Sequence, residues 1–127
     1  MNITVNITDG PLSAATDNFS CNDAGALIIF EGCVRPSEKD QPISALEYEA
    51  YEPMASEMLR KIGKEMILKH GLLAMDVQHS KGTVGAGEVS FRLRIAAAHR
   101  KEGIAAMQEF IDWMKKDVPI WKKPVYA

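Results

Sequence analysis

The sequence predicts a single α+β domain spanning residues 1–127, in which a largely antiparallel sheet carries packed helices. Segments with strand-like alternation outnumber those with helical periodicity, in the order strand, helix, strand, strand, helix, strand, strand, helix. Their short connections favour antiparallel pairing of neighbouring strands. With 127 residues, 46% of them hydrophobic, the chain is long enough for one substantial core and too short for two ordinary domains.

In the first half of the chain, residues 2–8 alternate apolar and polar side chains and predict a half-buried strand. Residues 12–19 carry apolar side chains at helical spacing and predict a short helix. The continuous apolar run within residues 24–35 predicts a central strand covered on both faces. Residues 36–42 predict a mobile polar loop, and residues 43–51 the strand that follows it.

In the second half, a helix is predicted from Pro53 to about His70, because proline suits a first helical turn and Gly71 suits a C-terminal cap. Residues 75–80 and 88–97 alternate in polarity and predict two strands. The glycine-rich residues 81–87 between them lack the order of a phosphate-binding loop and lead into a strand, so they predict a plain connection.

The last helix is amphipathic and ends at Pro119, which disfavours a helical Val118. On a helical wheel centred on Ile111, Lys115 lies about 40° from the centre of the buried stripe and Lys116 about 140° from it. Lys115 therefore either has a partly desolvated ammonium that can exchange protons, or extends its charged end into water. The stripe itself is predicted to contain Ile104, Met107, Ile111, Met114 and Val118.

After Pro119 the residues up to Pro124 are predicted to run extended and to return past the helix. In an extended segment alternate side chains share a face, so Trp121 and Lys123 point one way and Ile120 and Lys122 the other. This geometry allows Lys122 to approach the last turn of the helix.

The net charge of −2 hides an uneven distribution. Residues 1–53 hold two basic and nine acidic side chains, whereas residues 54–98 hold seven and four, and residues 99–127 six and four. This asymmetry favours a small anionic ligand near the C-terminal part, and the lack of a patterned basic stripe with stacking aromatics argues against nucleic acid. No long apolar run and no leader-like N-terminus are present, so we expect a cytoplasmic protein that does not enter a membrane.

Several further side chains are candidates for ligand contact. Cys21 and Cys33 lack the spacing of a zinc site or a disulfide framework and are expected to be free thiols, and no metal or cofactor is expected. Arg35, at the end of a strand, either holds an anion or is an ordinary surface arginine. His99 and Arg100 precede the last helix, whose N-terminus is suited to a phosphate.

Five segments follow one another along most of the chain. They are Gly25 to Arg35, Leu46 to Tyr51 with Met54-Ala55, Gly82 to Glu88, Ala98-His99-Arg100, and Pro119-Ile120-Trp121-Lys122-Lys123. Together, in this order, they resemble the large, catalytic subunit of molybdopterin synthase, and their agreement in register is more specific than any one of them.

This resemblance implies a domain of the α/β hammerhead type and a sulfurtransferase of molybdenum cofactor biosynthesis. The implied reaction converts cyclic pyranopterin monophosphate into molybdopterin by building its dithiolene. The implied sulfur donor is the thiocarboxylated C-terminal glycine of a small ubiquitin-like subunit. The implied assembly is a homodimer of large subunits within a heterotetramer.

The resemblance also implies roles for particular residues. Lys115 and Lys122 match the two essential lysines, and Lys115 is the residue that the helical wheel separates from Lys116. The positions that match substrate-binding residues are Cys33, Val34, Arg35, His99, Arg100, Lys115, Lys122, Lys123 and Pro124. We expect Lys115 to meet the thiocarboxylate and transfer protons, and Lys122 to stabilise charge and contact the substrate.

Three features depart from the family's usual sequence. Ser80 follows His79 where arginine is common, Pro124 follows Lys123 where an acidic residue is usual, and the sequence ends at Ala127, before the common tail. These departures bear on substrate affinity. The alternative function is that of a non-catalytic paralogue that docks the small sulfur-carrier subunit or a phosphorylated ligand.

Overall fold

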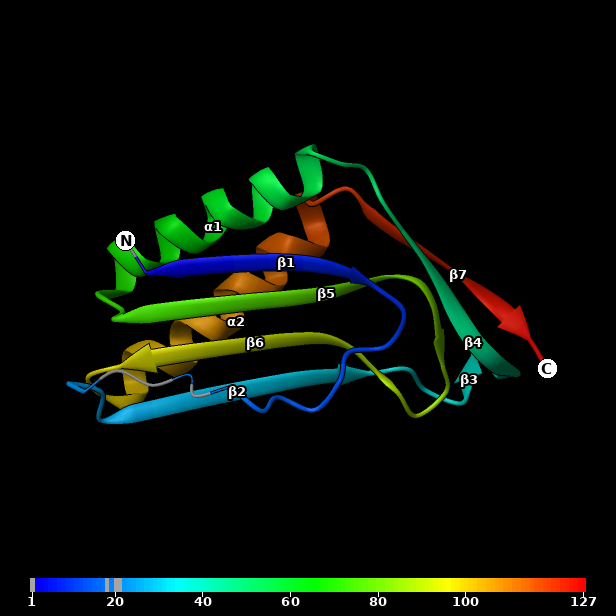
Figure 1. Cartoon of the computed structure of the whole chain (residues 1–127), viewed down its shortest axis with the longest axis horizontal. Helices are drawn as coiled ribbons and strands as arrows, with labels where there is room; N and C mark the ends of the chain where they lie inside the picture. The colour runs from blue at the N-terminus through cyan, green and yellow to red at the C-terminus, as the bar shows by residue number, and fades with distance from the viewer. Residues whose placement is uncertain (1, 18, 20–21) are drawn as a thin grey trace.

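The computed structural model describes residues 2–17, 19 and 22–127. Within these ranges it is an α+β fold with a mostly antiparallel sheet and two long helices (Figure 1), which confirms the predicted fold class. The elements are β1 (Ile3–Asp9), β2 (Ala26–Cys33), β3 (Ser37–Glu38), β4 (Gln41–Ala50), α1 (Met54–His70), β5 (Ala74–Gly85), β6 (Val89–Ala97), α2 (Arg100–Asp117) and β7 (Ile120–Tyr126).

The sheet is organised around β5, which is long enough to serve two groups of strands. Its first half pairs with β1 in parallel and with β6 in antiparallel orientation, and β2 follows β6. Its second half, from Gly82 to Gly85, pairs with β4, which in turn pairs with β7 and with the short β3. The residues predicted to form a plain glycine-rich connection therefore belong largely to a strand, because β4 supplies their backbone partners.

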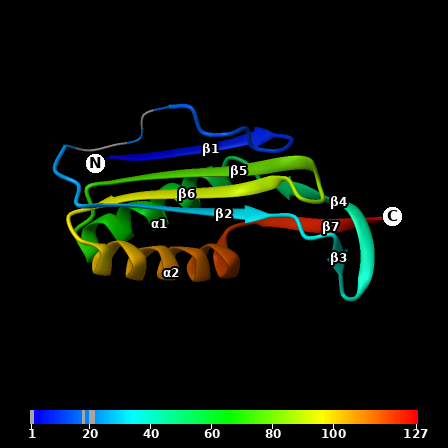
Figure 2. The same cartoon turned by 90° about the horizontal axis from the view of Figure 1, so that it is seen from below.

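Both helices lie on one face of the main sheet (Figure 2) and bury its core-facing side chains. The predicted limits of α1 are confirmed: Pro53 precedes it, and Gly71 ends it in the left-handed conformation, with φ of 66°. In α2 the buried residues are Gly103, Ala106, Met107, Phe110 and Met114. The predicted stripe was wrong at Ile104, which is 56% exposed.

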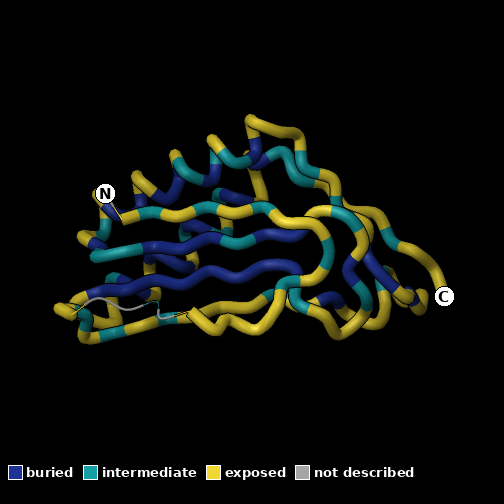
Figure 3. Tube along the Cα trace, viewed as in Figure 1, coloured by how far each residue is buried: buried dark blue, intermediate teal, exposed yellow. Residues whose placement is uncertain are grey.

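The predicted central strand of residues 24–35 is an edge strand. The run forms β2, whose only pairing partner among the described residues is β6, and Leu27 and Ile29 are 50% and 61% exposed. The buried centre of the sheet is β5 and β6 instead (Figure 3). A continuous apolar run shows that a strand tolerates burial on both faces, but its position depends on pairing with distant segments.

Two further local predictions were wrong. Residues 12–17 and 19 form no helix and cross the face of the sheet that carries no helices (Figure 2). The Leu12 amide donates to the carbonyl of Val89 at 2.9 Å, which holds the segment against β6. The expected mobile loop of residues 36–42 contains a β3–β4 hairpin, whose turn places Lys39 and Asp40 at positive φ.

Candidate active site

The chain reversal after α2 brings two lysines to one cavity. Val118 leaves the helix with an extended backbone, Pro119 follows, and β7 returns along β4. Lys115 in the last turn of α2 and Lys122 on β7 both line a cavity of about 430 Å³, whereas Lys116 does not. Lys122 thus approaches the last turn of the helix, as predicted. Lys115 lines the cavity and Lys116 does not, although both lysines are exposed.

The wall of this cavity is cationic and partly apolar. Its lining residues come from β2, β4, β5, β6, α2 and β7, and among the described ones there are two lysines and no carboxylate. They are Phe30, Gly32, Cys33, Tyr48, His79, Ser90, Phe91, Ile111, Met114, Lys115, Val118, Ile120, Trp121 and Lys122. Two positive charges without a negative neighbour favour an anionic ligand.

Three polar side chains of the sheet, from Tyr48, His79 and Ser90, line the same cavity. The hydroxyls of Tyr48 and Ser90 share a hydrogen bond of 3.0 Å. His79 packs edge-on against the Tyr48 ring, with a centroid distance of 5.4 Å, and its Nδ1 donates to the carbonyl of Ser80 at 2.8 Å. Burial lowers the pKa of His79, an effect that this hydrogen bond only partly opposes.

His79 is not among the functional residues predicted from the sequence. Its signal was nevertheless present, because the alternation along residues 75–80 places His79 on the same face as Met75 and Val77. A histidine on the apolar face of a strand either forms its hydrogen bonds within the core or faces a functional site. Only the three-dimensional arrangement decides between these two.

Other predicted substrate-binding residues lie away from this cavity in the single chain. Val34 is 2% exposed in a small separate core, and Arg35 is exposed. Lys123 lies opposite Glu47 in the β4–β7 register, on the other face of β7 from Lys122, and Pro124 lies opposite Leu46. Of the residues proposed from the resemblance, the cavity gathers Cys33, Lys115 and Lys122.

His99 and Arg100 occupy the opposite end of α2 from Lys115. His99 is the N-cap, and its side chain forms a capping box with Glu102, whose pKa is lowered mainly by hydrogen bonds from backbone amides. Arg100 is exposed. A rise of about 1.5 Å per residue puts Arg100 and Lys115 about 22 Å apart along the helix axis, so one chain does not bring them into one pocket.

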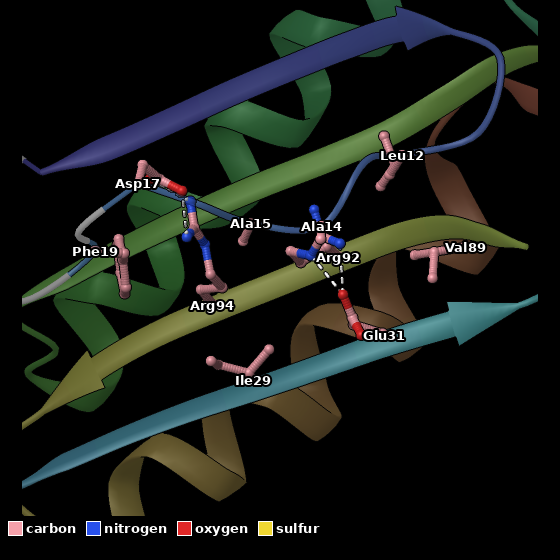
Figure 4. Close-up of a pocket in the computed structure, with 10 residues that line it drawn as sticks. All are labelled: Leu12, Ala14, Ala15, Asp17, Phe19, Ile29, Glu31, Val89, Arg92 and Arg94. Atoms are coloured by element: carbon pink, nitrogen blue, oxygen red, sulfur yellow. Dashed lines mark hydrogen bonds and ion pairs between the residues drawn. The ribbon is translucent and has the colours of Figure 1, made fainter.

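A second cavity, of about 560 Å³, lies on the helix-free face of the sheet (Figure 4). Two buried arginines of β6 stand in it. Arg94 binds both carboxylate oxygens of Asp17 at 2.9 Å and the carboxylate of Asp76 at 2.8 Å, and Arg92 donates to Glu31 at 2.6 Å. The Arg94 hydrogen bonds also lower the pKa of Asp17.

Because carboxylates occupy both guanidinium groups, this second cavity is close to charge balance and is a poor anion site. The pair of Arg94 and Asp17 instead fastens the segment before β2 to the sheet, and the pair of Arg92 and Glu31 joins β6 to β2 (Figure 4). The signal in the sequence was a pair of arginines at alternate positions of the strand, on the face that also carries Ser90. Alternation alone does not show whether the polar face meets water or a covering segment.

Within the described parts of the chain, no group of three or more His, Cys, Asp or Glu side chains is arranged to hold a metal ion. Cys33 is a free, exposed thiol, and Cys21 lies outside the described residues. No helix among the described residues combines the length and the apolar character needed to cross a membrane.

Comparison with known proteins agrees with this fold. Residues 7–117 match the family model described as MoaE protein. The chain is 35% identical over 129 residues to the molybdopterin synthase catalytic subunit of Aspergillus niger, covering 100% of this chain and 72% of that protein. It is 43% identical over 103 residues to that of Oryza sativa subsp. indica, covering 81% of this chain and 53% of that protein.

Solved structures give the same result. The molybdopterin synthase of Staphylococcus aureus superposes with a TM-score of 0.85 at 31% identity, covering 95% of this chain and 90% of that one. A Helicobacter pylori protein, solved as a complex of subunits 1 and 2 of molybdopterin-converting factor, superposes with a TM-score of 0.78 at 27% identity, covering 97% and 89%.

This α+β chain with a cationic cavity therefore belongs to the MoaE family. That family is the catalytic subunit of molybdopterin synthase, an enzyme of molybdenum cofactor biosynthesis. The chain spans 72% of the length of the Aspergillus relative and about half the length of the rice relative, at 53%.

Proposed function

We propose that this chain transfers sulfur from the thiocarboxylated C-terminal glycine of a small ubiquitin-like subunit to cyclic pyranopterin monophosphate, forming the dithiolene of molybdopterin. The observation that carries the proposal is the convergence of Lys115 and Lys122 on one cavity whose described lining holds no carboxylate. A thiocarboxylate and a phosphate are both anions, so fixed cations draw them together and offset their repulsion.

The two lysines have different roles in this proposal. Lys115, beside the apolar side chains of Ile111 and Met114 on the cavity wall, meets the thiocarboxylate and transfers protons. Lys122, fixed by strand pairing, stabilises the negative charge that develops at the glycyl carbonyl and contacts the substrate. Cys33 lines the same wall.

The proposed assembly is a homodimer of this chain within a heterotetramer. The small subunit is its sulfur-carrying partner, a proposal supported by the two-subunit Helicobacter pylori complex. Arg35, His99 and Arg100 anchor the substrate phosphate, with Lys123 and Pro124 nearby. Since Arg100 lies about 22 Å from Lys115 along α2, Arg100 and its neighbour His99 come from the second copy of the chain.

The test is a turnover assay with thiocarboxylated small subunit and cyclic pyranopterin monophosphate, in which the dithiolene product is quantified. We expect product from the native chain and a loss of about 100-fold or more in Lys115→Ala. Lys116→Ala, a neighbouring lysine outside the cavity, is the matched control and should retain native turnover. Binding of the small subunit without any product from the native chain would instead indicate a docking paralogue.

A further inference from the structure

His79 lies in the wall of the cavity that Lys115 and Lys122 line. Neither the roles proposed for these lysines nor the family resemblance gives His79 a function. It is 6% exposed, and its ring is held between Tyr48, at 5.4 Å between centroids, and Phe91, at 5.7 Å. β5, β4 and β6 supply these three residues, so the imidazole is fixed by the sheet. A side chain held by three strands is pre-organised for chemistry in the cavity that it lines.

The hydrogen bond of His79 determines which ring nitrogen carries the proton. Nδ1 lies 2.8 Å from the carbonyl oxygen of Ser80, and a carbonyl only accepts, so Nδ1 holds the hydrogen. In a neutral imidazole the lone pair is then on Nε2. No described residue forms a hydrogen bond with Nε2. Every fully buried side-chain nitrogen or oxygen of the described residues has a hydrogen-bond partner, so Nε2 is not fully buried and is open to the cavity.

The surroundings keep this imidazole neutral. Burial lowers the pKa of His79, and the charged groups that line the same cavity are Lys115 from α2 and Lys122 from β7. The other titratable lining groups are the Tyr48 phenol from β4 and the Cys33 thiol from β2. Burial is the effect that disfavours protonation of this imidazole, so Nε2 remains a proton acceptor in a cavity whose lysines are donors.

The proposed function requires such an acceptor. When the thiocarboxylate sulfur adds to an electrophilic carbon of the substrate, the electron pair displaced from that carbon moves to the oxygen bonded to it. The sulfur is then bonded both to the substrate and to the glycyl carbonyl, as a thioester. The small subunit leaves only when water cleaves the acyl carbon–sulfur bond. Water is a weak nucleophile until a base takes its proton.

We propose that His79 is the general base of this hydrolysis, an inference that rests on the proposed function. Nε2 takes a proton from water as its oxygen bonds to the glycyl carbon. The carbon–sulfur bond then breaks with its electron pair on sulfur, and Lys115 donates a proton to that sulfur. The imidazolium returns its proton to the lysine or to solvent, so thioester and water become carboxylic acid and thiol.

The other polar groups of the wall are less suited to this step. The Tyr48 and Ser90 hydroxyls are engaged with each other at 3.0 Å. Lys115 and Lys122 are donors when charged and have no lone pair to offer. His79 thus supplies the base and Lys115 the acid of one reaction.

The test uses His79→Asn in the full chain, mixed with thiocarboxylated small subunit and cyclic pyranopterin monophosphate in a single turnover. The Asn amide can still donate to the Ser80 carbonyl, but it has no acceptor at the position of Nε2. We expect the small subunit to accumulate as a covalent adduct with the substrate, detected by intact mass, and its release to slow by about 100-fold or more. His70→Asn, the same change at a histidine of α1 outside the cavity, should release at the native rate.

The outcomes separate the base from other roles. If a folded His79→Asn variant releases the small subunit at the native rate, or slows adduct formation without accumulating adduct, His79 is not the base. His79→Gln, checked by circular dichroism, replaces the Asn variant if that one fails to fold, and the same adduct is expected. Failure of the proposed function appears differently, because the native chain would then form neither adduct nor dithiolene.

Discussion

Lys122 on β7 lies directly opposite Tyr48 on β4 in the antiparallel register. Side chains at opposed positions of two strands share a face, so the lysine stands beside the tyrosine whose hydroxyl meets Ser90 at 3.0 Å. The charge of Lys122 therefore reaches the cavity from a paired strand. Strand pairing fixes the backbone of Lys122, and its exposed side chain contributes a positive charge to the cavity wall.

This placement predicts the behaviour of Lys122→Gln, which keeps much of the side-chain length and removes the charge. We expect a loss of about 10-fold or more in kcat/KM for cyclic pyranopterin monophosphate, together with a weaker dependence of that constant on salt. Steady-state kinetics at several ionic strengths measure both effects. Lys116→Gln should match the native chain, and an unchanged salt dependence in Lys122→Gln would contradict the electrostatic role.

The separation of Arg100 from Lys115 predicts complementation between two inactive variants. Lys115→Ala and Arg100→Ala are each expected to lose most turnover. If the two residues act across the dimer, a heterodimer of one Lys115→Ala and one Arg100→Ala chain has one intact site and one doubly altered site. Coexpression with two affinity tags isolates this heterodimer, which should recover about half of the native activity.

The matched control is a heterodimer of Lys115→Ala with Lys122→Ala, in which both residues belong to the same cavity and neither site is intact. It should remain as inactive as its parents. Inactivity of the Lys115→Ala and Arg100→Ala heterodimer would show that the phosphate anchors act within one chain, or that the dimer is arranged differently.

The features that sequence reasoning predicted well depend on local chemistry. Pro53, Gly71 and Pro119 determine helix limits through backbone constraints that act within a few residues, and α1 and α2 begin and end near them. The approach of Lys122 to Lys115 also follows from a local constraint. Pro119 ends the helix, and the extended residues after it run back past the last helical turn. Half of the lysine cavity was therefore predictable from one stretch of sequence.

The features it missed depend on which distant segments meet. The apolar run of β2 fits a centre or an edge, and only its pairing with β6 alone among the described strands makes it an edge. Arg92 and Arg94 have the alternation of a solvated face, yet Asp17 and Glu31 cover them from elsewhere in the chain. His79 becomes a candidate only when β4, β6, α2 and β7 surround it.

The buried pair of Arg94 and Asp76 predicts a large loss of stability when one partner is removed. Their side chains are 5% and 6% exposed, and the guanidinium lies 2.8 Å from the carboxylate. Arg94→Met leaves the Asp76 charge buried without its cation, so we expect a loss of about 3–5 kcal/mol in the free energy of unfolding, measured by urea denaturation. Asp17→Asn, which alters only the exposed partner, should cost much less.

A double-mutant cycle tests whether this loss comes from the unpaired charge. Arg94→Met combined with Asp76→Leu removes both charges, and the double variant should lose clearly less than the sum of the two single variants. Additive losses would mean that packing of the arginine stem, and not the buried carboxylate, accounts for the effect.

At the C-terminal end of α1, two basic side chains contact a carboxylate of α2. Lys69 donates to Glu109 at 2.8 Å and His70 lies 3.0 Å from its other carboxylate oxygen. The hydrogen bond from Lys69, followed by that from His70, lowers the pKa of Glu109 below its ordinary 4.5. A carboxyl group whose pKa is lower in the folded state than in the unfolded state stabilises the fold at pH values above its unfolded-state pKa. This stabilisation is lost as the pH falls through the folded-state pKa.

We therefore expect the native chain to lose more stability than Glu109→Gln between about pH 7 and about pH 3, so that the difference between them shrinks as the pH falls. Urea denaturation midpoints at both pH values measure this difference. Glu65→Gln, which removes an exposed carboxylate of α1 that has no ion pair among the described residues, should follow the native chain at both. A stability difference between native and Glu109→Gln that does not change with pH would show that the carboxylate charge contributes nothing to the contact between the helices.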